Sequence, residues 1–316
     1  MPLHPQAQAF IATINALQLR RPPITELTVA DARAGLKALL TPSDEAVAAI
    51  AEFDIPGGDG QPVRARAYTP RDAPMDARIG ALPLLVWLHG GGWVTGDLDS
   101  HDATCRALAN TSGCKIVAID YRLAPEHKFP AGLNDCYAAI AWLAAHGEAI
   151  GIDPRRIAVA GDSAGGNLAA AVALMARDRG GPALAFQLLV YPVTHHAFAT
   201  PSYRDFGDGH LLTLEGMRWN WNHYLPDATA GLDPLASPLL APDLRGLPPA
   251  LVILAECDPL CSEGEAYARR LADAGVPVEC KRYDGMLHAF FTLGQVFDDG
   301  QAAVEYAGGV LRRALG

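Results

Sequence analysis

The chain has 316 residues, of which 50% are hydrophobic and 19% are charged, and its net charge at pH 7 is −10. The length allows one large domain or two ordinary ones, and the apolar fraction excludes a disordered chain, which would be too poor in apolar residues to build a core. The excess of acidic residues argues against non-specific binding to nucleic acids or to an anionic membrane surface, because both interactions need clustered Lys and Arg.

About the first 50 residues predict helices. Apolar residues recur at helical spacing around Phe10 and Ile14, and again around Leu36. The glycine-rich residues 57–60 are typical of a turn, and a different pattern begins after them.

Strands and helices alternate through most of the remaining chain. Apolar or alternating runs predict strands at residues 63–68, 84–88, 116–119, 157–160, 186–190, 251–254 and 278–282. Patterns with helical periodicity fall at residues 100–111, 133–145, 164–177, 263–274 and 301–314. Short apolar strands joined by helices indicate an α/β fold with a parallel sheet. Residues 197–248 interrupt this alternation, and we expect a helical insertion near residues 213–225.

A pentapeptide between a predicted strand and a predicted helix has the sequence GDSAG, with Ser163 at its centre. A serine on such a sharp turn exposes its hydroxyl above the sheet, and flanking glycines let backbone segments pass close together. The helix N-terminus also places positive potential near the hydroxyl. Ser163 is therefore the candidate nucleophile; the alternative is a serine that only caps the helix.

A second glycine-rich turn, with the sequence HGGGW at residues 89–93, follows the second predicted strand. Consecutive glycines let the backbone loop around a reacting carbonyl and present its N–H groups to the developing oxyanion, which needs two or three donors about 3 Å away. We assign this oxyanion hole to Gly91, Gly92 and Ala164, the residue after the nucleophile. The alternative is a simple flexible loop. We expect His89 to hold the loop through hydrogen bonds rather than to act as a base.

A base and a carboxylate complete the candidate site. His288 follows the last predicted strand, and Asp258 follows the strand before it. Together with Ser163, these residues come directly after strands of one parallel sheet, and the carboxyl ends of such strands are where sites form. Their order along the chain is the one typical of α/β-hydrolases. His288 would remove the serine proton, and Asp258 would orient the imidazole and stabilise its cation.

These motifs resemble the bacterial hormone-sensitive-lipase-like carboxylesterases, in particular the branch that carries GDSAG. The sequence DYRLAPE at residues 120–126 and the surroundings of Asp258 and His288 are also similar to that family. The resemblance covers roughly residues 60–316. It implies an α/β-hydrolase fold, with a mostly parallel central sheet flanked by helices and a helical cap. It further implies the triad and oxyanion residues named above, no cofactor, and short acyl esters as substrates.

On this resemblance we expect residues 1–50 to form an N-terminal helical cap segment. Residues 51–316 would form the catalytic domain, with a cap insertion near residues 197–226. The apolar faces of the cap would line an acyl or alcohol pocket. The candidate substrate-binding residues are Trp93, Tyr191, Leu211 and Leu212.

The sequence predicts neither a membrane span nor a metal site. Its longest apolar run, residues 168–176, is far shorter than the roughly 20 residues that cross a bilayer. The start of the chain lacks the pattern of a signal peptide, so we expect a cytoplasmic location. The six cysteines form no CxxC pair and no zinc-ligand spacing, which favours reduced, buried thiols. The adjacent His195 and His196 are also a weak metal candidate, because sequence neighbours rarely bind one ion together.

The leading hypothesis is a serine carboxylesterase that hydrolyses short-to-medium acyl esters through an acyl-Ser163 intermediate. An amidase or deacetylase stays open as an alternative, because both reactions pass through the same kind of tetrahedral intermediate. A non-catalytic ligand receptor on the same fold is a third hypothesis, although such a protein would be expected to lack a triad member. The expected partner is a small-molecule ester, without nucleic acid or membrane, and a homodimer is left open.

Overall fold

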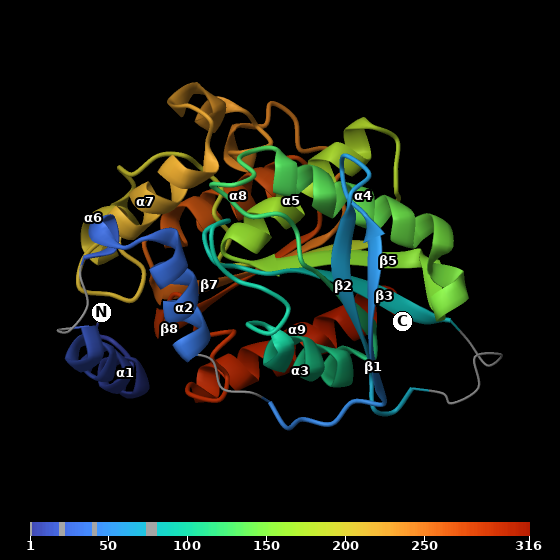
Figure 1. The fold of residues 1–316 in the computed structure, drawn as a ribbon, viewed down its shortest axis with the longest axis horizontal. Helices are drawn as coiled ribbons and strands as arrows, with labels where there is room; N and C mark the ends of the chain where they lie inside the picture. Colours follow the sequence, from blue (N-terminus) through green and yellow to red (C-terminus); the bar gives the residue numbers. More distant parts are fainter. Residues whose placement is uncertain (1, 19–22, 40–42, 74–80) are drawn as a thin grey trace.

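The computed structural model describes residues 2–18, 23–39, 43–73 and 81–316. At its centre lies an eight-stranded sheet (Figure 1). The strands are β1 (Ala49–Pro56), β2 (Pro62–Thr69), β3 (Leu82–Leu88), β4 (Lys115–Ile119), β5 (Ile152–Asp162), β6 (Phe186–Val190), β7 (Ala250–Cys257) and β8 (Val278–Leu287). They lie in the order β1-β2-β4-β3-β5-β6-β7-β8. β2 runs antiparallel to β1 and β4, and the remaining neighbours pair in parallel.

From β3 onwards, helices connect the strands. The α-helices of the described ranges are α1 (Pro5–Gln18), α2 (Val29–Leu39), α3 (Asp102–Ser112), α4 (Ala131–His146), α5 (Ala164–Asp178), α6 (Pro201–Phe206), α7 (Leu214–Tyr224), α8 (Cys261–Asp273) and α9 (Asp298–Leu315). Single 3₁₀ turns are η1 (Ile24–Glu26), η2 (Gly147–Ile150), η3 (Ala228–Leu232) and η4 (Pro238–Leu240).

The strands of the parallel region carry apolar side chains on both faces. On β3, Leu84, Val86 and Leu88 belong to one buried cluster, and Leu85 and Trp87 belong to another. Helices α4, α5 and α8 cover the first cluster, and α3 and α9 cover the second (Figure 1). Because helices cover both faces, the inner strands β3, β6 and β7 appear in the sequence as continuous apolar runs.

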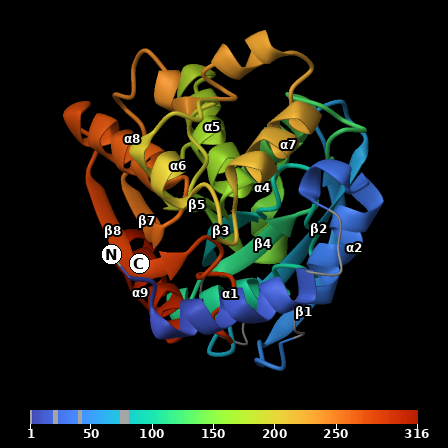
Figure 2. The ribbon, with the colours of Figure 1, turned by 90° about the vertical axis from the view of Figure 1, so that its left-hand side faces the viewer.

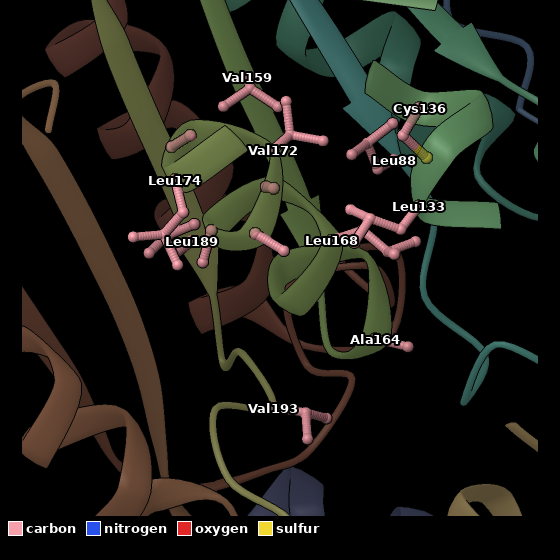
Figure 3. Close-up of a cluster of buried hydrophobic side chains, with 14 of the residues drawn as sticks. Leu88, Leu133, Cys136, Val159, Ala164, Leu168, Val172, Leu174, Leu189 and Val193 are labelled. Carbon is pink, nitrogen blue, oxygen red and sulfur yellow. The ribbon is translucent and has the colours of Figure 1, made fainter. Parts of the chain in front are cut away.

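Helix α5 lies in the middle of the first cluster. Figure 3 shows Leu168 and Val172 of α5 in one group with Val159 of β5 and Leu133 of α4. All four side chains are fully buried. Burial of such a side chain contributes about 1.5–3 kcal/mol. The cluster therefore holds α5, and the residue from which α5 starts, firmly against the sheet.

The α/β fold with a mostly parallel sheet is confirmed, and each predicted strand and helix has a counterpart in the structure. The prediction missed β1, because we expected helices over about the first 50 residues. In β1 only Ile55 is buried, so this edge strand has no apolar run that would indicate it. Its pairing with β2 sets its conformation instead. The expectation of buried cysteines also needs a correction, because Cys280 is exposed on the edge strand β8, whereas the others are buried.

Two separate parts of the chain gather on one side of the molecule. Figure 2 shows the N-terminal helices α1 and α2 together with α6 and α7 on the side that faces the viewer. The 3₁₀ turn η1 contacts α7, so the N-terminal segment and the insertion between β6 and β7 touch each other. Within the described ranges, no helix is both long enough and apolar enough to cross a membrane.

Candidate active site

Ser163 is the single residue between the end of β5 and the start of α5. Its backbone has φ 55° and ψ −118°, a conformation that costs an L-residue about 1–3 kcal/mol. The Ser163 N–H donates to the carbonyl oxygen of Val190 at 2.9 Å, which ties the turn to the end of β6. Packing of α5 against the sheet keeps the turn sharp, and the side chain of Ser163 stands at the carboxyl end of the strand.

The two glycines of the pentapeptide are required by the close approach of α5 to β3. A Cβ atom on Gly165 would overlap the carbonyl oxygen of Leu88. On Gly161 it would meet the same oxygen at 2.5 Å. Any side chain at either position would push the first turn of α5 away from the sheet and would move Ser163 with it.

The structure brings Ser163, His288 and Asp258 into one hydrogen-bonded chain. His288 Nε2 lies 2.9 Å from Ser163 Oγ, and His288 Nδ1 lies 2.6 Å from Asp258 Oδ2. The other carboxylate oxygen of Asp258 accepts from the N–H of Leu260 at 2.9 Å. Since a carboxylate can only accept, the imidazole proton is assigned to Nδ1, and Nε2 is left to accept the serine proton.

The predicted oxyanion donors lie in the loop after β3 and at the start of α5. Gly91 and Gly92 both have positive φ, at 118° and 61°, and the Gly91 carbonyl is held by the N–H of Thr95 at 2.9 Å. Ala164 is the first residue of α5, where helical N–H groups have no partner within the helix. Among the residues that the structure describes, none accepts a hydrogen bond from the N–H of Gly91, Gly92 or Ala164. These donors are therefore available to a negatively charged oxygen.

A cavity of about 340 Å³ opens above Ser163 and His288. Both cap segments contribute to its wall, together with the oxyanion loop, residues 89–93. From the insertion come Leu211, Leu212, Trp219 and Asn220. From the N-terminal segment come Phe10, Ile24, Leu27 and Leu36. The wall is largely apolar, as a pocket for an acyl or alcohol group should be.

Two of the predicted pocket residues lie elsewhere, and their assignment is corrected. Trp93 is buried in the core, where its ring stacks on Tyr224 with centroids 4.2 Å apart. Tyr191 is buried behind His288, and the two ring centroids are 4.6 Å apart. Among the described residues, neither belongs to the wall of the cavity.

Sequence reasoning missed several residues of the wall. Trp219 and Asn220 lie on α7, and the Asn220 amide packs against Gly92, where a Cβ atom would overlap it. Ser100 and His101 reach the cavity from the start of α3. The N-terminal contribution was expected only as a general cover. The spacing of these residues along the chain carries no signal, because separate elements bring them together.

A larger cavity, of about 420 Å³, lies next to the active-site cavity and shares Leu36 and Ser100 with it. Charged side chains dominate its wall, including Arg33, Lys37 and Glu126, and Ser163 does not reach it. Across the described ranges, no three His, Cys, Asp or Glu side chains are grouped so as to hold a metal ion.

Comparison with known proteins agrees with this geometry. Residues 85–292 match the family model for the alpha/beta hydrolase fold. The chain belongs to the α/β-hydrolase family. This hydrolase superposes on the crystal structure of a thermostable esterase from Pseudomonas putida ECU1011 with a TM-score of 0.93 and 42% sequence identity, over 100% of this chain and 98% of the other.

Two relatives of this hydrolase are named as ester hydrolases. Carboxylic ester hydrolase LipN of Mycobacterium tuberculosis is 45% identical over 78% of this chain, and the match covers 65% of LipN. Ethyl acetate hydrolase of Pseudomonas putida is 36% identical over 95% of each chain. The resemblance of the motifs to the hormone-sensitive-lipase-like carboxylesterases is thereby confirmed.

Proposed function

We propose that this protein is a serine carboxylesterase that hydrolyses small esters with short-to-medium acyl chains through an acyl-Ser163 intermediate. The observation that carries the proposal is the unbroken chain from Ser163 through His288 to Asp258, with contacts of 2.9 and 2.6 Å, beside N–H groups that lack acceptors among the described residues. The names of the relatives support ester hydrolysis as the class of reaction.

Acylation uses the hydrogen-bonded chain as a proton path. Ser163 Oγ attacks the ester carbonyl carbon while its proton passes to His288 Nε2, and Asp258 stabilises the imidazolium that forms. The carbonyl oxygen becomes negative and accepts hydrogen bonds from the free N–H groups of Gly91, Gly92 and Ala164. When the tetrahedral intermediate collapses, the imidazolium gives its proton to the departing alkoxide, which leaves as the alcohol.

Deacylation repeats the sequence with water. His288 removes a proton from a water molecule, whose oxygen attacks the acyl carbonyl carbon. The second tetrahedral intermediate uses the same N–H donors. Ser163 Oγ then leaves and regains its proton from the imidazolium, and the carboxylic acid is released. Each cycle therefore returns the enzyme to its starting protonation state.

The size of the cavity supports a small substrate. Its volume of about 340 Å³ lies near the lower end of the range of about 300–1,000 Å³ for small-molecule sites. Each methylene buried against the apolar wall contributes about 0.8 kcal/mol until the chain meets the end of the pocket. Beyond that point overpacking costs more than burial returns. We expect an optimum at acyl chains of about four to eight carbons.

The test is kcat/KM over p-nitrophenyl esters from acetate to palmitate. We expect an optimum at intermediate length and little activity on emulsified long-chain triglycerides. An optimum at palmitate with activation at the emulsion surface would overturn the pocket argument. Anilides with the same acyl groups form a second arm, and anilide rates equal to the ester rates would favour an amidase or deacetylase instead.

Ser163→Ala is the control for the nucleophile. It should lower kcat by about 10⁴-fold or more, because the covalent step is lost. Ser112→Ala removes a buried hydroxyl that donates to the Leu108 carbonyl and accepts from the N–H of Cys114, both away from the active site, and it should leave kcat unchanged. An organophosphonate should add to Ser163. Full activity in Ser163→Ala would contradict the proposed function.

The proposal includes a domain division and two expectations about the whole protein. We place the cap in residues 1–50 and near 197–226, and the catalytic domain in 51–316. Of the first segment, residues 1, 19–22 and 40–42 lie outside the described residues. The strand β1, which begins at Ala49 and pairs within the sheet, lies at this boundary. A cytoplasmic location and a homodimer stay predictions, to be measured by fractionation and light scattering.

A further inference from the structure

A second Asp–His pair lines the active-site cavity. Asp162 directly precedes the nucleophile, and His101 comes from the start of α3. Asp162 Oδ1 lies 3.0 Å from His101 Nε2 and accepts from the N–H of Gly90 at 2.8 Å. Both side chains are buried. Neither takes part in the proton transfers of the proposed reaction, so their place in the site needs another explanation.

The contacts of His101 require protons on both ring nitrogens. Ser100 Oγ lies 2.7 Å from the Asp97 carbonyl oxygen and 2.8 Å from His101 Nδ1. The carbonyl can only accept, so the single hydroxyl proton points to it, and Nδ1 must donate to Ser100 Oγ. On the other side of the ring, Nε2 faces the carboxylate, which also accepts.

The Gly90 N–H is shared unequally between the two partners. It lies 2.8 Å from Asp162 Oδ1 and 3.3 Å from His101 Nε2, so it bonds mainly to the carboxylate and leaves Nε2 free to donate. Burial would raise the pKa of Asp162, but the attraction of His101 and the N–H of Gly90 outweigh burial and lower this pKa. Asp162 is thus a carboxylate that faces a doubly protonated imidazole.

Gly90 links this pair to the oxyanion loop. Its N–H is bound one residue before Gly91, the first proposed oxyanion donor. A Cβ atom on Gly90 would overlap the carboxylate of Asp162, so only glycine lets the loop approach this closely. On the preceding residue, the hydroxyl of Tyr121 donates to the His89 carbonyl at 2.7 Å. The loop is therefore held on both sides of the peptide that leads to the donors.

The charge of the pair also matters for the reaction. An unpaired carboxylate next to Ser163 would repel the negative oxygen of the tetrahedral intermediate. A positive imidazole 3.0 Å away cancels most of that field. The pair can then supply a rigid hydrogen-bond acceptor beside the oxyanion hole with no net charge.

We propose that Asp162 and His101 form a charge-neutral ion pair that positions the oxyanion loop through the N–H of Gly90. The proposal rests on the proposed function, because it takes the loop to be the site of the oxyanion. Asp162 and His101 are positioning residues in this scheme. Their loss weakens binding of the tetrahedral intermediate and leaves binding of the ester itself largely intact.

The test compares Asp162→Asn with Asp135→Asn. Asp135 is the matched control, because it is also a buried carboxylate. It accepts from the N–H of Gly58 at 2.9 Å and pairs with Arg122 at 2.7 Å. Asp162→Asn should lower kcat on p-nitrophenyl butyrate by about 10- to 100-fold with little change in KM, since misplaced donors affect only the transition state. Asp135→Asn should lower Tm and leave kcat unchanged.

Two further measurements separate positioning from general stability. Ser163 Oγ adds to the carbonyl carbon of a trifluoromethyl ketone, and the ketone oxygen becomes an oxyanion that mimics the tetrahedral intermediate. The affinity of the enzyme for this inhibitor should therefore fall in parallel with kcat in Asp162→Asn. In ¹⁵N NMR at neutral pH, both ring nitrogens of His101, assigned through His101→Gln, should carry protons.

Three results would each contradict a different part of the argument: the positioning role of the pair, the charge cancellation, or the proposed function. Unchanged kcat and ketone affinity in a destabilised Asp162→Asn variant would show a purely structural pair. A His101 ring with one protonated nitrogen would overturn the charge cancellation. Residual full activity in Ser163→Ala would instead remove the proposed function on which the pair depends.

Discussion

The side chain of His89, the first residue of the oxyanion loop, is buried. Its ring stacks on Tyr121 with centroids 4.3 Å apart, and Nδ1 lies 2.8 Å from the carbonyl oxygen of Gly90. In the described part of the chain, Nε2 has no hydrogen-bond partner. A neutral ring that donates through Nδ1 fits these surroundings, because a charged ring would be buried with one donor unsatisfied.

The burial of His89 makes stability depend on pH. Burial, and secondarily the nearby His101, lower the pKa of His89 to about 4. In the unfolded chain the pKa of a histidine is about 6.5, which is about 2.5 pH units above the value in the folded protein. The unfolded state therefore binds more protons between these values, and the folded state loses stability as pH falls from about 6.5 towards 4.

His89→Phe should flatten this dependence, because it removes the group that titrates. The measurement is the free energy of unfolding in urea at several pH values between 4.5 and 7.5. His146→Phe is the matched control, since His146 is exposed and its loss should leave the slope unchanged. An unaltered slope in His89→Phe would show that other groups cause the acid sensitivity.

At the scale of elements, the packing of α9 on α3 depends on one of two adjacent glycines. A Cβ atom on Gly308 would overlap the side chain of Thr111 in α3. On the next residue, Gly309, it would meet only the end of the Arg313 side chain, at 3.8 Å. The two positions have the same helical backbone and differ in what faces them.

Substitution by alanine should therefore act in opposite directions at these positions. Gly309→Ala should stabilise the protein by about 0.5–1 kcal/mol, because alanine loses less backbone entropy in a helix. Gly308→Ala should destabilise it by about 1–3 kcal/mol through overpacking. Thermal unfolding measures both. Equal effects at the two positions would contradict the contact between α9 and α3.

The helix α2 is joined to the catalytic domain through Arg33. This guanidinium forms a bidentate ion pair with Glu126, at 2.8 and 2.7 Å. It also donates to the carbonyl oxygens of Val94 at 2.9 Å and Ala124 at 3.1 Å. The ion pair is partly exposed and contributes at most about 1 kcal/mol, so the bonds to the carbonyls are the larger share of the attachment.

Arg33→Met should loosen α2 more than Glu126→Gln does. The first variant removes every bond that Arg33 makes, and the second leaves its bonds to the two carbonyls in place; both retain the ion pair of Lys37 with Asp97. Amide hydrogen exchange over residues 23–39 measures the difference, and kcat/KM should fall with it because α2 lines the active-site cavity. Equal exchange in both variants would show that the ion pair alone holds the helix.

At the scale of the whole molecule, the N-terminal segment contacts the loop that carries the catalytic histidine. The N–H of His4 donates to the carbonyl oxygen of Gly285 at 3.0 Å, three residues before His288. Phe10 packs edge-on against Phe297, with ring centroids 5.3 Å apart, and also reaches the cavity. This segment therefore supports the site and covers apolar surface of the catalytic domain.

Deletion of residues 1–40 should lower both activity and solubility. The truncated protein would expose the apolar surface under α1 and would lose one side of the substrate cavity. Activity on p-nitrophenyl butyrate, dye binding to exposed apolar surface and the soluble yield are the measurements. A soluble truncation with full activity would show that the N-terminal segment is dispensable.

Much of this protein is determined by local features of its sequence. Continuous apolar runs predict the parallel strands because helices cover both faces of the sheet. Ser163, Asp258 and His288 are identifiable for a related reason. Each directly follows a predicted strand, and the carboxyl ends of parallel strands meet at one edge. Glycine spacing around Ser163 and in the oxyanion loop reflects close backbone contacts, which leave a signal in the sequence.

Other features depend on contacts between residues that are far apart in the chain. β1 lacks an apolar run and exists through its pairing with β2. The wall of the cavity comes from two cap segments, and Trp93 turns into the core although it adjoins the oxyanion loop. The pairing of Asp162 with His101 joins residues 61 positions apart (162 − 101 = 61). Such contacts form when whole helices and strands pack together, so the spacing of residues along the chain does not predict them.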